Sequence, residues 1–420
     1  MQKICVMGLG YIGLPTASLL ATKGYIVHGV DVNREAVGII NNGGIQIHEP
    51  DLDIMVKAAV QSGNLHAAVE PDEADVFIIA VPTPFKDEHV PDITYVEQAA
   101  RAIAPCLKSG NLIILESTSP VKTTENIADW LKELRPDLHI PERDIYGLNT
   151  LKESADRIYI AHSPERVLPG QILKELVEND RVIGGIDQAS AAIAGEFYRS
   201  FVKGEIKLTD SRTAELCKLT ENAFRDVNIA FANELSLISD QLDINVWQLI
   251  ELANRHPRVS ILQPGPGVGG HCIAVDPWFI VDSVPEQTRL IRTAREINDS
   301  KPDFVLEKVC CKASRFKEPV IACLGLSFKA DIDDLRESPA LEIVKKIAEK
   351  ELGRILVVEP HIKSLPERLR EHPGIELVDL GRALQEADLI VLLVNHRVFA
   401  DVNREVLKEK VIIDTRGIWK

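Results

Sequence analysis

The chain has 420 residues, 45% of them hydrophobic, which is enough for two or three domains with substantial cores. Its formal net charge of −15 argues against nonspecific nucleic-acid binding, and an anionic ligand would need a local concentration of positive charge. The seven scattered cysteines do not suggest a disulfide framework or a metal site, and no apolar run reaches the ~20 residues that span a bilayer. We therefore expect a cytoplasmic protein without metal, nucleic acid or membrane as a partner.

The N-terminal residues follow the order strand, glycine turn, helix, strand. A strand is expected over 3–7, and the turn Gly8-Leu9-Gly10-Tyr11-Ile12-Gly13 leads into a helix over 14–23. A second strand ends at Asp31, at the distance from the turn where a carboxylate reaches the ribose hydroxyls of a dinucleotide. Because a carboxylate repels the 2′-phosphate of NADP, the pattern predicts NAD. The alternatives are that Arg34 favours NADP, or that the turn only packs a helix on a sheet.

Hydroxyl side chains follow two further strands at their carboxyl ends, where ligands bind in doubly wound sheets. The strand expected over 74–81 leads to Thr83, and the strand over 111–116 leads to Thr118. Both threonines are therefore candidates for a ligand site. Helix capping is the alternative role, and we expect it for Ser119.

A charged pair follows the next strand, which is expected over 157–161. Glu165 and Arg166 lie in the segment 162–170 that follows it, at the same edge of the sheet as the threonines. They fit a ligand site and a surface ion pair equally well.

One uninterrupted helix is expected from Ser211 to about Leu242, because Ser211 can cap it and neither proline nor glycine breaks it. Lys218, Asn222 and Arg225 have the spacing i, i+4, i+7 and share one face. Such a polar face lies either in solvent or against a polar ligand. The pattern alone slightly favours solvent.

The segment 265–276 is rich in glycine and contains Cys272 and Asp276. Glycine lets the main chain approach a ligand, which Cys272 would then meet as a nucleophile. The alternative is a buried cysteine with a packing role only, which is the commoner case. Asp276 follows Cys272 by four residues, so a helical turn would place both on one face, although Asp276 could equally cap the next segment. His256 and Arg258 add basic character shortly before the loop.

The last third repeats the alternation of strands and helices. Strands are expected over 319–324, 354–358, 387–394 and 411–414. Its first turn lacks the glycine fingerprint, which predicts a nucleotide-type domain whose ligand is not a dinucleotide. Lys329, Arg336 and Arg416 lie at or near strand ends and could hold phosphates, and a helix over about 287–312 brings the chain across.

Motifs spread from Gly8 to Arg416 make the chain similar to the UDP-sugar 6-dehydrogenases, which oxidise UDP-glucose and UDP-N-acetylhexosamines to uronic acids. The matching segments are the fingerprint at 8–13, then 80–84, 116–118, 163–170, 214–222, 265–276, 325–329 and 336–338. The forms found at 164–170, 256–258 and 270–272 resemble the N-acetylhexosamine branch. This resemblance implies UDP-N-acetyl-D-mannosamine as substrate, with UDP-N-acetyl-D-glucosamine and then UDP-glucose as alternatives, in the synthesis of surface polysaccharide precursors.

The fold implied is α/β, with two Rossmann-like, doubly wound parallel-sheet domains joined by a helical central domain. We expect an NAD-binding domain over 1–208, a central dimerisation and catalytic domain over 209–299, and a UDP-sugar-binding domain over 300–420. The family resemblance also implies at least a homodimer formed on the long helix. In such a dimer the loop with His256 and Arg258 can reach the neighbouring subunit.

The resemblance implies a four-electron oxidation at C6 in which Cys272 captures the aldehyde and later carries a thioester that water hydrolyses. Lys218 and Asn222 would stabilise the oxyanion, so the polar face of the long helix would be a site instead of a solvated stripe. The implied catalytic residues are Cys272, Lys218, Asn222, Asp276, Glu165 and Thr118. The implied cofactor-binding residues are Gly8, Gly10, Tyr11, Ile12, Gly13, Asp31, Thr83, Thr118 and Arg336. The implied substrate-binding residues are Glu165, Arg166, Val167, Lys218, Asn222, Arg225, His256, Arg258, Gly267, Phe328, Lys329 and Arg416.

Two other classes of function fit part of the pattern. A two-electron 3-hydroxyacid dehydrogenase shares the N-terminal half but needs neither the loop cysteine nor the second nucleotide-type domain. A sugar-nucleotide sensor would keep the binding residues without catalysis, and the intact set of Lys218, Asn222, Cys272 and Asp276 argues against it.

Overall fold

The computed structural model describes residues 2–47, 49–86, 89–144, 156–270 and 272–419. The chain divides into two compact units, one of Met1–Glu221 with Trp278–Val284 and the other of Asn222–Pro277 with Pro285–Lys420. Each unit has its own sheet and its own core.

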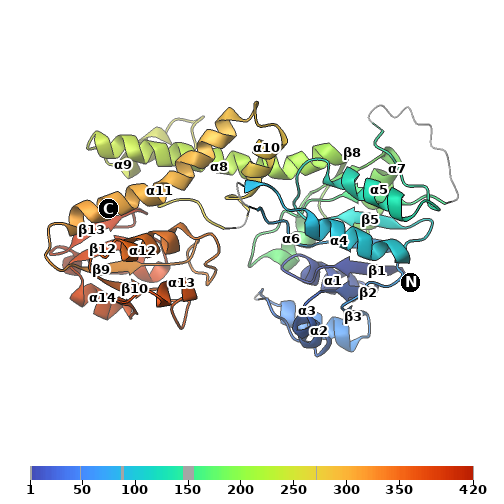
Figure 1. Cartoon of the computed structure of the whole chain (residues 1–420), viewed down its shortest axis with the longest axis horizontal. Helices are drawn as coiled ribbons and strands as arrows, with labels where there is room; N and C mark the ends of the chain where they lie inside the picture. Colours follow the sequence, from blue (N-terminus) through green and yellow to red (C-terminus); the bar gives the residue numbers. More distant parts are fainter. Residues whose placement is uncertain (1, 48, 87–88, 145–155, 271, 420) are drawn as a thin grey trace. The chain divides into compact units, whose positions relative to one another are not determined.

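Among the described residues, the larger unit contains an eight-stranded sheet in the order β3-β2-β1-β4-β5-β6-β7-β8 (Figure 1). Its strands are β1 (Lys3–Met7), β2 (Ile26–Val30), β3 (Leu65–Ala68), β4 (Val76–Ile79), β5 (Leu112–Leu115), β6 (Tyr159–His162), β7 (Arg181–Gly185) and β8 (Ile206–Asp210). In this order the strands β3, β2, β1, β4, β5 and β6 run parallel, as expected. In contrast, β7 and β8 run in the opposite direction, because the connection after β6 returns the chain from the same edge of the sheet.

Helices cover both faces of this sheet. The strands are apolar on both faces, so each face is buried beneath helices. In β1, Ile4 and Val6 belong to one buried cluster, whereas Cys5 and Met7 belong to the other. A strand buried on both faces reads as a continuous apolar run, because successive side chains point to opposite faces. The helices are α1 (Gly13–Thr22), α2 (Arg34–Asn41), α3 (Leu52–Gln61), α4 (Thr94–Ile103), α5 (Thr123–Leu134), α6 (Ile172–Glu178) and α7 (Gln188–Arg199), with a short 3-10 helix at Ala104–Cys106.

The described part of the smaller unit contains a parallel five-stranded sheet in the order β11-β10-β9-β12-β13, coloured orange to red in Figure 1. Its strands are β9 (Val320–Leu324), β10 (Arg354–Val358), β11 (Ile375–Leu377), β12 (Leu389–Leu392) and β13 (Val411–Asp414). The helices that alternate with them are α12 (Pro339–Glu349), α13 (Glu367–Arg370), α14 (Leu380–Glu386), α15 (Arg397–Ala400) and α16 (Arg404–Leu407). This sheet also has a buried cluster on each face.

The middle of the chain is helical, and the boundary between the units falls inside its longest helix. Its helices are α8 (Ser211–Gln241), α9 (Val246–Ala253), α10 (Asp276–Ser283) and α11 (Arg289–Ala313). The expected helices over 211–242 and 287–312 correspond to α8 and α11. Among the described residues, no helix is both long and apolar enough to cross a membrane.

Candidate active site

The glycine fingerprint forms the turn between β1 and α1. Gly8 has a φ of +92°, and a Cβ there would lie 2.5 Å from the Ala80 carbonyl oxygen. A Cβ at Gly13 would lie 1.8 Å from the Gly8 carbonyl oxygen, so close packing alone requires both glycines. At Gly10, however, a Cβ would meet nothing within 4 Å. The open space at Gly10 fits the approach of a pyrophosphate to the start of α1.

Asp31 lies directly after β2 and helps to hold the fingerprint turn. Its Oδ2 accepts a hydrogen bond of 3.0 Å from the Leu9 N–H, and its Oδ1 accepts one of 2.9 Å from the Asn33 N–H. A carboxylate oxygen has more than one lone pair, so both oxygens still have acceptor capacity for the hydroxyls of a ribose. The donor and acceptor set therefore fits a dinucleotide.

Thr83 and Thr118 meet at the carboxyl ends of β4 and β5, where the Thr83 hydroxyl donates to the Thr118 carbonyl oxygen at 2.5 Å. Tyr11 lies at the surface of the same unit. Arg336 belongs to the smaller unit, where it forms an ion pair of 2.6 Å with Asp334. The cofactor residues inferred from resemblance are thus divided between the two units.

The expected capping role of Ser119 is wrong. Helix α5 begins four residues later at Thr123, and a carboxylate from α8 binds its N-terminal amides instead. Glu215 accepts from the Lys122 N–H at 2.7 Å, and from the Thr124 N–H at 2.8 Å. Since Glu215 is distant in sequence, no local pattern could have revealed it.

Glu165 and Arg166 do not form the surface pair that the sequence left open. Glu165 is buried, and its Oε2 accepts a hydrogen bond of 2.8 Å from Nη1 of Arg181. Arg166 forms an ion pair with Glu221 of α8, and Val167 packs against the core of the same unit. Arg181, which fixes the carboxylate of Glu165, was not identified from the sequence, because it becomes a neighbour only through sheet pairing.

A second buried carboxylate lies close to this pair. Glu116 accepts a hydrogen bond of 2.6 Å from the Tyr198 hydroxyl. Burial raises the pKa of Glu116 to about 7, an effect that Arg181 opposes and Glu165 reinforces. Two carboxylates thus share the charge of one arginine, which favours a proton on Glu116 near neutral pH.

The polar face of α8 is buried over part of its length. Lys218 is half-buried, Asn222 and Asp226 are buried, and Arg225 is exposed. The Nδ2 of Asn222 donates to Oδ2 of Asp276 at 2.5 Å. The solvated face that the pattern slightly favoured is therefore wrong for Asn222.

The loop cysteine is exposed, which contradicts the alternative of a buried packing residue. Its carbonyl oxygen accepts hydrogen bonds from the N–H groups of Val275, at 3.0 Å, and Asp276, at 2.9 Å. Cys272 thus starts a turn that leads into α10, which begins at Asp276. Asn222 and Asp276 therefore make contact one turn after the cysteine.

The glycines of the loop pack against side chains of the smaller unit. A Cβ at Gly265 would lie 2.7 Å from Nη1 of Arg416, and a Cβ at Gly270 would lie 2.9 Å from the ring of Phe328. At Gly267 a Cβ would lie 2.8 Å from Pro339. We expected these glycines to let the main chain approach a ligand, but at these three positions the space that a Cβ would take is filled by protein side chains.

Arg416 is held against the loop by the end of β12, since its Nε donates to the Leu393 carbonyl oxygen at 3.0 Å. Burial lowers its pKa to about 10, and Asp414 acts in the opposite direction. Lys329 is exposed on the turn after β9. His256 and Arg258 are exposed after α9, and His271 lies outside the described residues.

A chain of buried amides fixes the start of the loop, and sequence reasoning missed it. The Gly265 N–H donates to Oδ1 of Asn233 at 2.9 Å, and Nδ2 of Asn233 donates to Oδ1 of Asn298 at 2.8 Å. Asn298 in turn donates to Oδ1 of Asp226 at 2.8 Å. Arg295 completes the chain with a bond of 2.5 Å to the same oxygen. The loop with Cys272 is thereby tied to α8 and α11.

Comparison with protein families gives three adjacent matches. Residues 2–202 match the NAD-binding domain of the UDP-glucose/GDP-mannose dehydrogenase family, residues 212–300 its central domain, and residues 322–420 its UDP-binding domain. The chain belongs to this family. It is an NAD-dependent UDP-sugar dehydrogenase, as the fingerprint and the cysteine loop suggested.

Relatives of this dehydrogenase are similar over nearly their whole length. An NDP-N-acetyl-D-galactosaminuronic acid dehydrogenase from Ralstonia nicotianae is 61% identical, over 100% of this chain and 96% of the relative. A UDP-N-acetyl-D-mannosamine dehydrogenase from Campylobacter jejuni is 59% identical, over 96% and 98%. The solved structure of a UDP-N-acetyl-mannosamine dehydrogenase from Staphylococcus aureus is 42% identical, with a TM-score of 0.85 over 100% of this chain and 96% of that chain.

Proposed function

We propose that this dehydrogenase oxidises the C6 hydroxyl of UDP-N-acetyl-D-mannosamine to a carboxylate through a covalent intermediate on Cys272. The observation that carries the proposal is the exposed Cys272 at the start of a turn whose Asp276 bonds to Asn222. An exposed thiol can reach a substrate aldehyde, and a carboxylate one turn away can hold water for the later hydrolysis.

Covalent capture gives each residue a separate task. The Cys272 thiolate attacks the C6 aldehyde to form a thiohemiacetal, and removal of a second hydride from that carbon leaves a thioester. Lys218 and Asn222, one turn apart on α8, stabilise the oxyanion of the tetrahedral species. Water held by Asp276 then hydrolyses the thioester, with Glu165 and Thr118 assisting or positioning the reacting groups. Each uronic acid thus requires two hydride transfers and one water.

NAD bound at the fingerprint turn would supply the hydride acceptor for each of the two oxidations. We place its pyrophosphate at Gly10 and the amides of Tyr11, Ile12 and Gly13, where a Cβ at Gly10 would meet open space. Asp31 would bind the ribose. Gly8 shapes the turn, and Thr83, Thr118 and Arg336 are further contacts proposed from the family resemblance.

The UDP-sugar would bind at the edge of the smaller sheet, where Arg416 and Lys329 supply positive charge to an acidic protein. The guanidinium of Arg416 and the ammonium of Lys329, both near strand ends, suit a diphosphate. The Phe328 ring offers an apolar surface for a base or sugar. The remaining proposed contacts are Glu165, Arg166, Val167, Arg225, His256, Arg258 and Gly267, as the family resemblance implies.

The names of the relatives support two N-acetylhexosamines. Relatives from Campylobacter jejuni and Escherichia coli, at 59% and 57% identity, carry mannosamine in their names, as does the Staphylococcus aureus structure. The Ralstonia nicotianae relative at 61% favours a second candidate, UDP-N-acetyl-D-galactosamine. The two sugars differ in configuration at C2 and C4 and share the C6 hydroxyl on which the chemistry depends.

The covalent scheme is tested by the stoichiometry of NADH to uronic acid in wild type and in Cys272→Ala. We expect two NADH per product and a loss of uronic acid formation in the variant of at least ~10³-fold, because the aldehyde is no longer captured. One NADH per product, or full activity in Cys272→Ala, would refute the scheme. Cys311→Ala, which removes another exposed cysteine, should leave activity unchanged.

The sugar is assigned by a panel of UDP-N-acetyl-D-mannosamine, UDP-N-acetyl-D-galactosamine, UDP-N-acetyl-D-glucosamine and UDP-glucose. The proposal predicts the highest kcat/KM for the mannosamine compound. A higher value for UDP-N-acetyl-D-galactosamine would instead support the second candidate, and preference for UDP-glucose would contradict both.

A further inference from the structure

The turn after β9 carries Phe328 and Lys329, and its backbone is hydrogen-bonded to a buried carboxylate. Oε2 of Glu359 accepts hydrogen bonds from the N–H groups of Leu326, at 2.8 Å, and Ser327, at 3.1 Å. Burial alone would raise the pKa of Glu359, but the hydrogen bonds from His396 and the Leu326 amide outweigh burial and lower it. Glu359 therefore remains an ionised acceptor for the turn.

His396 holds the other end of the same turn. Its Nδ1 accepts a hydrogen bond of 2.9 Å from the Asp331 N–H, so this nitrogen carries no proton. The proton therefore lies on Nε2, which donates to Oε2 of Glu359 at 3.1 Å. Nε2 is also 3.3 Å from the Ser327 hydroxyl, which donates to the Lys329 carbonyl oxygen at 2.6 Å. One fully buried ring thus connects both ends of the turn.

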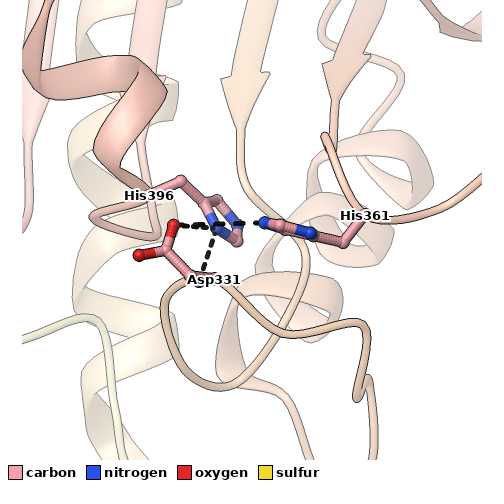
Figure 2. A group of neighbouring side chains, drawn as sticks. All are labelled: Asp331, His361 and His396. Carbon is pink, nitrogen blue, oxygen red and sulfur yellow. Dashed lines mark hydrogen bonds and ion pairs between the residues drawn. The ribbon is translucent and has the colours of Figure 1, made fainter.

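Asp331, His361 and His396 also lie near enough to suggest a metal site, since their ligand atoms fall within 4.8 Å of one another (Figure 2). The hydrogen bonds argue against that interpretation. Both ring nitrogens of His396 are engaged, one by the Asp331 amide and the other by Glu359, so a metal would have to displace a bond of the turn. The contacts of His396 instead describe a structural support.

The comparison with the larger unit shows what is distinctive in this arrangement. Asp31 after β2 and Glu359 after β10 occupy matching places in the two sheets, and each accepts an amide from the turn after the neighbouring strand. Glu359, however, is buried and additionally bound by His396, whereas Asp31 is only half-buried. Asp31 could thus face a ribose, whereas its counterpart Glu359 is enclosed beneath the turn.

We propose that Glu359 and His396 are positioning residues that hold the segment Gly325–Asp331 in the shape that presents Phe328 and Lys329 to the UDP-sugar. This inference rests on the proposed function, in which these two side chains contact the nucleotide sugar. The buried bonds fix the backbone on both sides of Lys329, and an exposed side chain is oriented only as well as its backbone is held.

Variants of His396 separate its two hydrogen bonds. His396→Asn keeps an acceptor near the position of Nδ1, His396→Gln keeps a donor near Nε2, and His396→Ala keeps neither. With the full-length enzyme and UDP as titrant in calorimetry, we expect His396→Ala to weaken UDP binding by about tenfold, as for the loss of one or two hydrogen bonds. His396→Asn should recover part of this loss. We expect KM for the UDP-sugar to rise with little change in kcat or in KM for NAD.

His361→Ala is the matched control, because the His361 ring is partly exposed and lies 4.0 Å from Asp331. It should leave UDP binding unchanged; a loss equal to that of His396→Ala, restored by added Zn²⁺, would overturn the positioning role in favour of a metal site. Unchanged UDP binding in a folded His396→Ala would also overturn it. If His396→Ala does not fold, the same comparison is made with His396→Asn and His396→Gln.

A double variant decides whether His396 acts through the turn. Lys329→Ala alone should weaken UDP binding, and adding His396→Ala should weaken it by less than the two separate losses combined, because the group being positioned is gone. Fully additive losses would overturn the inference. Unchanged binding in Lys329→Ala would refute the proposed contact of Lys329 itself, and is therefore distinguishable from failure of the positioning role.

Discussion

The same residue type serves opposite purposes within the fingerprint turn. Gly13 is needed because the turn folds back on itself, whereas Gly10 faces open space. In the loop before Cys272, Gly265 and Gly270 resemble Gly13 in allowing close packing, because they leave room for Arg416 and Phe328. A glycine in a motif therefore indicates close approach, and only the surroundings identify what approaches.

Alanine at these two positions should separate folding from cofactor binding. Gly10→Ala should keep the stability of the wild type within about 1 kcal/mol but raise KM for NAD at least ~10-fold, because its Cβ occupies the space of the pyrophosphate. Gly13→Ala should unfold more easily by ~3 kcal/mol, since its Cβ would lie 1.8 Å from a carbonyl oxygen. Urea denaturation and NADH kinetics measure the two effects. Equal stability losses in both variants would contradict this distinction.

At the level of elements, helix α8 shows how one regular segment acquires different functions along its length. Near its start Glu215 binds the N-terminus of α5, and in its middle Asn222 contacts Asp276. Further along, Asn233 binds the amide of Gly265. The helix therefore supports the larger unit, the proposed oxyanion site and the cysteine loop in turn.

The buried amide chain predicts that Asn298→Ala reduces both stability and turnover. The substitution leaves Nδ2 of Asn233 without its acceptor and removes one of the two donors to Oδ1 of Asp226, which keeps its bond from Arg295. It should lower the free energy of unfolding by about 1–3 kcal/mol. Because Asn233 holds Gly265, kcat should fall as well. The control is Asn228→Ala, whose amide bonds only along α8 to the Phe224 carbonyl oxygen among the described residues, and which should change stability by less than ~0.5 kcal/mol. Denaturant titration showing equal effects in both variants would argue against the role of the chain.

At the scale of the whole molecule, α8 leaves large apolar side chains in solvent. Phe224, Phe231 and Ile238 are 69%, 51% and 47% exposed, and their spacing of seven residues places them on one face. Large apolar side chains that recur in solvent on one helix face commonly mark an interface between proteins. It supports the homodimer that the family resemblance implies.

We predict that the wild type elutes as a dimer in size-exclusion chromatography with light scattering. Phe231→Glu should shift the mass toward the monomer, because a charge buried in an apolar interface costs several kcal/mol. Glu133→Lys, at an exposed charged position of α5 instead of α8, serves as the control and should remain dimeric. A monomeric wild type would refute this assembly.

The sequence by itself determined the order of the elements and the family. Apolar strands, the glycine fingerprint and the uninterrupted helix are local patterns, because backbone geometry repeats every two or 3.6 residues. Strand β1 and the bounds of α8 follow the expectation to within a residue. The proposed roles of Cys272, Lys218 and Asn222 likewise depend on motifs that lie within short segments.

Only the tertiary structure decided which side chains become neighbours across long stretches of chain. Four contacts pair residues that are separated in the sequence. They are Glu215 with the start of α5, Arg181 with Glu165, the chain from Arg295 to Gly265, and His396 with the turn that carries Lys329. A buried polar group requires a partner, but its own sequence neighbourhood does not specify which strand or helix provides one. Packing decides the partner, because it determines which strands and helices meet. A buried donor or acceptor can then bond only to a group on one of those neighbouring elements.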